Sequence, residues 1–197
     1  MITLRGVSHR FGDRVVLDGL DLDLPAGAVT TVMGPSGVGK TTLARVLLGL
    51  LRPDAGEVHG LDGLRRAAVF QEDRLCEQLG AVGNVRLVLG RSAPAAAVVA
   101  ELAAVGLAGD DLAKPVHQLS GGQRRRVAIV RALAADADLV VLDEPFTGMD
   151  AATKAQVMVH VHERCAGRTV VLVTHDAGEA AWFGTRTVRL PPPSADG

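Results

Sequence analysis

The sequence predicts an α/β domain whose parallel β-sheet is covered by helices on both faces. Short runs of consecutive apolar residues, such as LVVLD (139–143) and TVVLV (169–173), alternate with helical segments. Such runs are typical of strands that are buried on both faces, and strands that alternate with helices pair in parallel. Between residues 72 and 116 the apolar residues are dispersed, which indicates an inserted helical subdomain.

The first thirty residues predict two antiparallel strands with one solvated face. Apolar and polar residues alternate in ITLRGV (2–7) and in VVLDGLDLDL (15–24). Gly12 and Asp13 between these runs suit a turn. We therefore expect an N-terminal antiparallel β subdomain.

A strand, a glycine-rich loop and a helix are expected next. The strand is AVTTVMG (28–34), and RPDAG (52–56) ends the helix. The buried face of the helix is predicted from apolar residues spaced three and four apart, which are Leu43, Val46, Leu47 and Leu50.

The remaining elements complete the alternating pattern. Further strands are expected at 67–71, 137–145, 169–175 and 185–190, and helices at 94–107, from 120 onward, at 152–165 and at 177–183. We expect one domain over residues 1–190, with a core formed by 1–71 and 117–190, a helical subdomain over 72–116 and a disordered tail over 191–197.

Charge and composition exclude several classes of partner. The net charge is −1, with 21 basic and 22 acidic residues, which argues against a surface that neutralises nucleic acid. The aromatic residues are too few and scattered to stack bases; they are Phe11, Phe70, Phe146, Trp182 and Phe183. Cys76 and Cys165 follow no metal-ligand spacing, so we expect reduced thiols. No apolar run approaches the ~20 residues that span a bilayer, so we expect no membrane span and no signal segment.

A phosphate-binding loop is predicted at GPSGVGKTT (34–42), which fits G-x-x-x-x-G-K-[ST] between a strand and a helix. The glycines allow the backbone amides to surround anionic oxygens. A lysine there reaches the β- and γ-phosphates and a hydroxyl binds Mg²⁺. The candidate nucleotide-binding residues are Gly34, Ser36, Gly37, Gly39, Lys40, Thr41 and Thr42. The alternative is a glycine-rich turn that precedes a lysine by chance.

Two acidic residues follow a buried strand. Asp143 and Glu144 stand at the carboxyl end of LVVLD (139–143), where ligands bind in open α/β sheets. Asp143 is placed to hold Mg²⁺, and Glu144 is placed to act as the general base that activates water. The alternative is a strand that ends in two solvated acids.

The stretch LSGGQRRR (119–126) begins a predicted helix with a serine and two glycines. Capping alone would explain Ser120. It would not explain Gly121 and Gly122, which instead suit a helix N-terminus that binds an anion.

Together the loop, LSGGQ (119–123) and the strand ending in Asp143 and Glu144 resemble the ATP-binding cassette (ABC) ATPases over nearly the whole chain. The resemblance implies a P-loop NTPase (RecA-like) core, ATP and Mg²⁺ as cofactors, and ATP hydrolysis. It also implies two copies that enclose two ATP molecules head to tail. Ser120, Gly121 and Gly122 of one copy would then bind the γ-phosphate held by Lys40 of the other.

Further residues match motifs of the family one by one. Gln71 resembles the Q-loop glutamine, a ligand of Mg²⁺ or of the attacking water, which would make Thr41, Gln71 and Asp143 the metal site. TGMD (147–150) resembles the D-loop, which implies a dimer contact for Asp150. His175 resembles the switch histidine that contacts the γ-phosphate. Phe11 resembles the aromatic residue that stacks on adenine, and a packing role is its alternative.

Three features resemble the importers of this family. The cassette has no fused membrane spans, THDAGEA (174–180) is similar to the T-H-D-x-x-E-A of bacterial importers, and AKPVHQ (113–118) lacks the acidic element of exporters. The most similar group takes up nitrate, sulfonates, taurine and thiamine precursors.

This resemblance implies a peripheral subunit on the cytoplasmic face of the cell membrane. It would form a homodimer and bind membrane-spanning permease subunits, and indirectly an extracellular solute-binding protein. The segment 71–85 resembles the part that docks the membrane subunit but lacks the Pro-Trp frequent in relatives. Alternatives are an exporter or lipoprotein-release cassette, and a soluble ABC ATPase without a transport role.

Overall fold

The computed structural model describes residues 1–90, 93–184 and 186–191, so residues 192–197 of the expected tail lie outside the described residues. The chain divides into two compact units. The first contains Met1–Ala68, Ala137–Asp143 and the chain from Gly167 onward, and the second contains Val69–Asp136 and Glu144–Ala166. The predicted helical segment 72–116 falls inside the second unit.

The first unit contains a three-stranded antiparallel sheet in the order β2-β1-β4. β1 (Ile2–Phe11) pairs with both β2 (Arg14–Leu24) and β4 (Ala55–His59). The two predicted strands are therefore confirmed, whereas β4 was not predicted. Its sequence, AGEVH, is short and almost wholly exposed, so it lacks the apolar alternation that marks a half-buried strand.

The same unit contains a five-stranded sheet in the order β5-β6-β7-β3-β8. Its strands are β5 (Arg66–Val69), β6 (Leu139–Asp143), β7 (Thr169–Val173), β3 (Val29–Met33) and β8 (Arg186–Arg189). The pairs β6–β7, β7–β3 and β3–β8 are parallel. Every residue of β6 and β7 is buried, which confirms the prediction of a parallel sheet with both faces covered.

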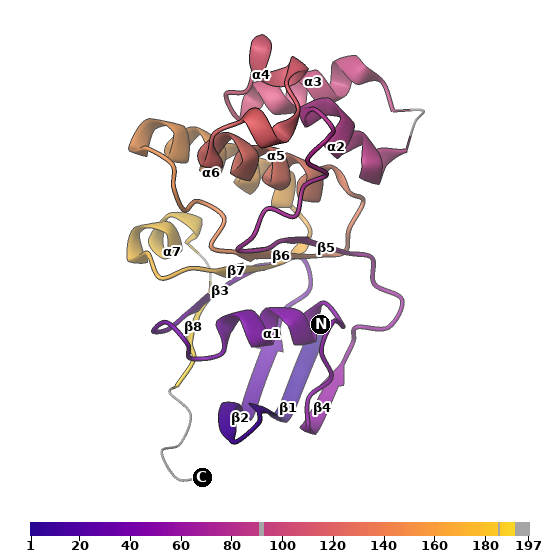
Figure 1. Ribbon diagram of the computed structural model, residues 1–197. Coiled ribbons are helices and arrows are strands. Elements are labelled where there is room, and N and C mark those ends of the chain that lie inside the picture. Colours follow the sequence, from indigo (N-terminus) through magenta and orange to yellow (C-terminus); the bar gives the residue numbers. More distant parts are fainter. Residues whose placement is uncertain (91–92, 185, 192–197) are drawn as a thin grey trace. The chain divides into compact units, whose positions relative to one another are not determined.

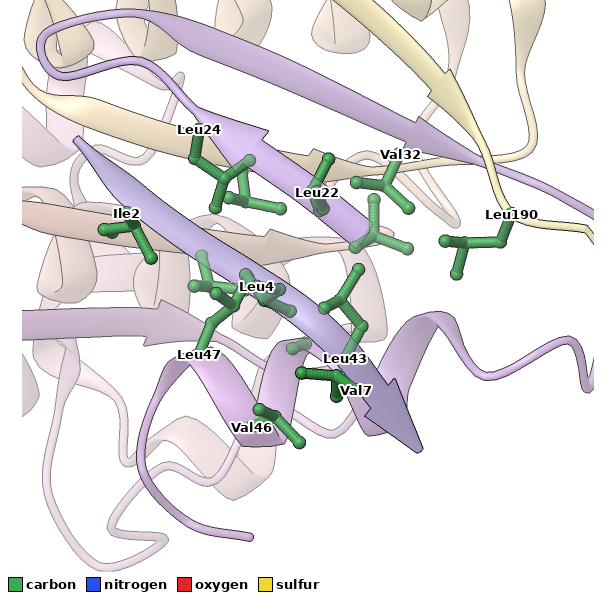
Figure 2. Close-up of a cluster of buried hydrophobic side chains, with 14 of the residues drawn as sticks. Ile2, Leu4, Val7, Leu22, Leu24, Val32, Leu43, Val46, Leu47 and Leu190 are labelled. Carbon is green, nitrogen blue, oxygen red and sulfur yellow. The ribbon is translucent and has the colours of Figure 1, made fainter. Parts of the chain in front are cut away.

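Helix α1 (Lys40–Leu47) lies between the two sheets of this unit, and α7 (Ala177–Phe183) lies on the opposite face of the larger sheet (Figure 1). Figure 2 shows side chains of α1, β1, β2 and β3 pointing toward one another in one apolar cluster. Leu43 and Leu47 are completely buried in it. The cluster fixes α1, and with it the loop that precedes the helix.

The end of α1 differs from the prediction. Leu50 does not continue the buried stripe, because it lies outside the helix and is 60% exposed. Gly49 has φ +71, its amide donates to Val46 O, and the Leu50 amide donates to Arg45 O. This pair of bonds is the Schellman motif, which glycine favours because it adopts the left-handed conformation without strain.

The second unit is helical. Its elements are α2 (Ala81–Leu89), α3 (Ala95–Ala104), α4 (Asp110–Ala113), the 3₁₀ turn η1 (Val116–Gln118), α5 (Gly121–Ala134) and α6 (Ala151–Cys165). Helix α5 contacts α2, α3 and α6. None of the helices in the described part of the chain is long and apolar enough to cross a membrane.

Replacing Leu43 by alanine should destabilise the protein by about 2–5 kcal/mol, because it leaves a cavity between α1 and the sheets. Urea unfolding at equilibrium measures this change. Leu50→Ala is the matched control on the exposed side and should change stability by less than about 0.5 kcal/mol. Equal effects of the two substitutions would contradict the position of the core.

Candidate functional site

The first unit gathers three of the predicted segments at one edge of its parallel sheet. The glycine-rich loop follows β3, Asp143 is the last residue of β6, and His175 stands two residues after the end of β7. Because β6, β7 and β3 are neighbours and parallel, their carboxyl ends share this edge. That is the edge at which open α/β sheets bind ligands.

The glycine-rich loop has a backbone that requires its glycines. Gly37 and Gly39 have φ of +78 and +104, and a Cβ on Gly39 would lie 2.5 Å from Val16 O. Lys40 Nζ donates to Gly34 O at 2.8 Å and to Pro35 O at 2.9 Å. Carbonyls of the loop thus hold the ammonium group of Lys40 at the loop, and the glycine conformations are those from which backbone amides can form a nest for an anion.

The N-terminus of α1 suits an anionic ligand. Its N-cap is Gly39, which has no side chain to accept a hydrogen bond from the first amides of the helix, and its first turn contains no acidic residue. The partial positive charge at this helix N-terminus is thus available to an anionic ligand. Of the other predicted residues here, Ser36 is exposed on the loop, whereas Thr42 is buried in the helix.

Thr41 and Asp143 lie in direct contact. Thr41 Oγ1 donates to Asp143 Oδ2 at 2.8 Å, and Asp143 is 3% exposed. Among the described residues there is no cluster of three or more histidine, cysteine or acidic side chains that could hold a metal. One carboxylate and one hydroxyl beside a phosphate nest nevertheless fit Mg²⁺, which binds few protein ligands and keeps waters and substrate phosphates.

The turn that carries His175 is fixed by buried hydrogen bonds. Thr174 Oγ1 donates to Glu179 Oε2 at 2.5 Å, and both residues are buried. Asp176 caps α7 by accepting from the amides of Gly178 and Glu179. His175 itself is exposed, so its backbone is held while its side chain faces solvent.

Phe11, at the end of β1, is 48% exposed and meets the ring of His9 edge-on, with 4.7 Å between centroids. It is therefore not a core residue. Nearby, Arg14 Nη2 donates to the Gly37 carbonyl at 3.2 Å. Sequence reasoning missed this contact, because an arginine that begins a strand carries no signal of a loop 23 residues away.

The second unit brings other predicted residues together around a cavity of about 570 Å³. Its lining consists of Gln71, Asp73, Ser120, Gly121, Gly122, Arg125, Arg126, Thr147, Gly148, Met149, Asp150 and Thr153. The cavity is thus shared by the segment after β5, the start of α5 and the loop before α6. Four of its residues are charged, which suits a polar ligand.

The start of α5 is a capping box. Ser120 Oγ accepts from the Gln123 amide at 3.2 Å, and Gln123 Oε1 accepts from the Ser120 amide at 2.8 Å. The two glycines have different surroundings: a Cβ on Gly122 would lie 3.2 Å from Gly148 O, whereas one on Gly121 would meet no described atom within 4 Å. Packing within the unit thus accounts for Gly122 and leaves the surface at Gly121 open.

Asp150 is the N-cap of α6. Its carboxylate accepts from the amides of Ala152 and Thr153 and from the Thr153 hydroxyl at 2.7 Å. These bonds, that of the Thr153 amide first, lower the pKa of Asp150 below its ordinary value. The exposed carboxylate is therefore ionised at neutral pH.

Glu144 stands in an uncommon backbone conformation, with φ +50. Its carbonyl oxygen accepts from Arg125 Nη2 at 2.8 Å. Sequence reasoning missed Arg125, because a run of three arginines on a helix predicts a solvated face. The only signal was its proximity to LSGGQ (119–123).

The family described as "ABC transporter" matches residues 17–147. Aliphatic sulfonates import ATP-binding protein SsuB 3 of Paraburkholderia xenovorans is 43% identical over 187 residues, which cover 94% of this chain and 74% of the relative. The SsuB 1 protein of Nocardia farcinica is 42% identical over 192 residues, which cover 96% of this chain and 77% of the relative.

Two solved structures are similar over almost their full length. An ATP-binding cassette in a dimeric post-hydrolysis state, bound to ADP and Pi, gives a TM-score of 0.87 at 29% identity, with 100% of this chain and 97% of that chain covered. A dimeric bacterial ABC transporter cassette gives 0.85 at 31% identity, with 96% and 94% covered.

Replacing Gly39 by alanine should lower ATP affinity by at least about tenfold, because the new Cβ forces the loop away from Val16 O and out of its phosphate-binding conformation. Titration with a fluorescent ATP analogue measures the dissociation constant. Arg45→Ala, exposed on the same helix, should leave that constant within about twofold. A folded Gly39→Ala protein with unchanged affinity would contradict the proposed nest.

Proposed function

Because this chain belongs to the ABC transporter family, we propose that it is the cassette that powers uptake of a small organic anion, and that the residues described above perform its ATPase cycle. It is an ATP-binding and ATP-hydrolysing subunit of an importer. The observation that carries the proposal is the glycine-rich nest at α1, beside which Thr41 is hydrogen-bonded to Asp143.

The first unit supplies the binding of the nucleotide. The amides of the loop over Gly34–Lys40 and the N-terminus of α1 receive the phosphates. Lys40 exchanges its loop carbonyls for β- and γ-phosphate oxygens, which bind an ammonium group more strongly because they are charged. The exposed ring of Phe11 stacks on the adenine.

Thr41 and Asp143, with Gln71, hold Mg²⁺. When bound, Mg²⁺ neutralises the charge that develops on the β- and γ-phosphates. The hydroxyl and carboxylate of the first two residues are already turned toward each other. The chain itself therefore orients these two ligand groups before the nucleotide arrives.

Hydrolysis requires a base for the attacking water. Glu144 is the general base, and its backbone is held in a strained conformation at φ +50. His175 donates to the γ-phosphate from the fixed turn between β7 and α7, and Gln71 orients the water. Glu144 accepts a proton from the water, whose oxygen bonds to the γ-phosphorus as the bond from that phosphorus to the ADP oxygen breaks, so that ADP and phosphate are released.

Two cassettes act together. We assign the cavity at the start of α5 to the γ-phosphate held by a second cassette, which contacts the Ser120 hydroxyl and the amides of Gly121 and Gly122. The open space at Gly121 supports this assignment, because nothing described in its own unit requires a glycine there. The ionised Asp150 contributes to the contact between the two copies.

The transported solute is proposed from the relatives, whose names specify import of aliphatic sulfonates. A sulfonate or a similar small organic anion is the solute class for this system. The segment 71–85 docks a permease subunit on the cytoplasmic face of the membrane, and an external binding protein delivers the solute. The exporter and non-transport alternatives are not favoured, because the two curated relatives reported above are named as import proteins.

Glu144→Gln should reduce the turnover of ATP by at least about a hundredfold, because the amide cannot accept the proton of the attacking water. It should also trap an ATP-bound dimer, since closure no longer ends in hydrolysis. Phosphate release and light scattering after size exclusion measure both effects. Adding Lys40→Ala should abolish the dimer, and a Glu144→Gln protein that stays monomeric in saturating ATP and Mg²⁺ would contradict the two-cassette site.

The transport role predicts a membrane partner. A tagged chain purified from detergent-solubilised membranes of its source should bring down a multi-span permease in stoichiometric amount, identified by mass spectrometry. The permease would be of the importer type, and a sulfonate should stimulate ATP hydrolysis of the complex in the presence of its binding protein. Recovery without any membrane protein would refute the transport proposal while leaving the ATPase chemistry intact.

A further inference from the structure

Helix α5 carries four arginines, and all of them donate to backbone carbonyls of the second unit. Two of them, Arg125 and Arg131, reach carbonyls of Glu144 and of the segment 70–74. Arg125 is only 5% exposed, and Arg131 is half-buried. Burying a guanidinium is costly unless its donors are satisfied. The positions of their acceptors therefore indicate what these residues are for.

Arg125 connects two segments that are far apart in the sequence. Its Nη2 donates to Glu144 O at 2.8 Å. Its Nη1 donates to Phe70 O and, at 3.2 Å, to Asp73 Oδ1. One guanidinium thus holds Glu144 and both sides of Gln71 against α5.

Arg131, nearly two turns further along α5, holds the end of the same segment. Its Nη1 donates to Arg74 O at 2.7 Å and its Nη2 to Asp73 O at 3.1 Å. The guanidinium carbon of Arg74 in turn lies 4.1 Å from the centroid of the Phe70 ring. Arg125 and Arg131 thus hold the turn over residues 70–74 at its start and at its end.

These contacts coincide with backbone strain. In the described ranges 1–90, 93–184 and 186–191, Arg74 and Glu144 are the only residues other than glycine with positive φ, at +47 and +50. Such conformations persist only when the surrounding structure enforces them. The carbonyl of Arg74 accepts from Arg131 and that of Glu144 accepts from Arg125, so each strained residue is held by an arginine of α5.

We infer that Arg125 and Arg131 are positioning residues of the ATPase: they hold the strained turn 70–74 and the backbone of Glu144 on α5, and so set the orientation of Gln71 and Glu144. This inference rests on the roles proposed above for those two residues. It also links the α5 N-terminus to the base, because Ser120 and Arg125 belong to the same helical segment. A phosphate bound at Ser120 would thereby order the helix that holds Glu144.

Kinetics of the full-length chain test this inference. Arg125→Gln should lower kcat for ATP hydrolysis by about tenfold or more, as misplacement of reacting groups does, while the dissociation constant for ATP stays within about threefold because the nest at α1 lies in the other unit. Arg125→Lys keeps the charge but loses the planar guanidinium, so its kcat should lie between those of the wild type and of Arg125→Gln. Arg164→Ala, a partly exposed arginine of α6, is the control and should match the wild type.

Hydrogen exchange of the nucleotide-free protein gives a readout that does not depend on activity. Arg125→Gln should speed amide exchange in peptides over 70–75 and 144–150 and leave 95–104 unchanged, and Arg131→Gln should affect 70–75 alone. Unchanged amide exchange together with an unchanged kcat would overturn the inference. It would also be overturned if kcat and ATP binding both fell in proportion to the fraction of folded protein. If Arg125→Gln does not fold, Arg125→Lys and Arg131→Gln decide. A wild-type chain without ATPase activity would refute the proposed function, and the exchange result would still decide the positioning role.

Discussion

The burial of α1 between two sheets is the constraint on which the nucleotide site depends. Its apolar stripe faces a cluster to which both sheets contribute, so the helix cannot shift without exposing that cluster to water. Its N-terminus is consequently fixed beside the carboxyl ends of β3 and β6. The glycine loop must then close the short path from β3 to α1, and it passes so near Val16 O that Gly39 has no room for a side chain. The packing thus fixes the conformation of the loop for which we propose phosphate binding.

The second unit achieves order by a different means. Gln71 and Glu144 of this unit lie outside helices and strands, and at Arg74 and Glu144 the backbone is strained. Apolar packing cannot hold a turn whose carbonyls need hydrogen-bond partners, because a buried carbonyl without a donor is costly. Arginines supply several donors in a fixed plane, and one guanidinium can therefore satisfy carbonyls from two segments. Helix α5, which packs against α2, α3 and α6, carries these arginines.

Much of the fold could be predicted because its signals are local. Apolar runs predicted β6 and β7, periodicity predicted α1, and the glycines with Lys40 predicted the loop. β4 was missed because AGEVH has almost no buried residue. Leu50 was misplaced because the apolar spacing continued past Gly49, where the backbone turns left-handed. The contacts of Arg125 had no local signal at all, since its acceptors lie 19, 52 and 55 residues away, and two of them are backbone carbonyls present at any residue type.

The capping box at Ser120 shows how one residue can serve both its own helix and a ligand. Capping uses the serine oxygen as an acceptor for the Gln123 amide, whereas a phosphate needs the hydroxyl as a donor. A hydroxyl can do both at once, since it has one proton and two lone pairs. The box also fixes the direction in which the first turn of α5 presents its amides. The capping explanation of LSGGQ (119–123) and the ligand-binding explanation are therefore compatible, because the cap holds the helix end in the form that an anion would bind.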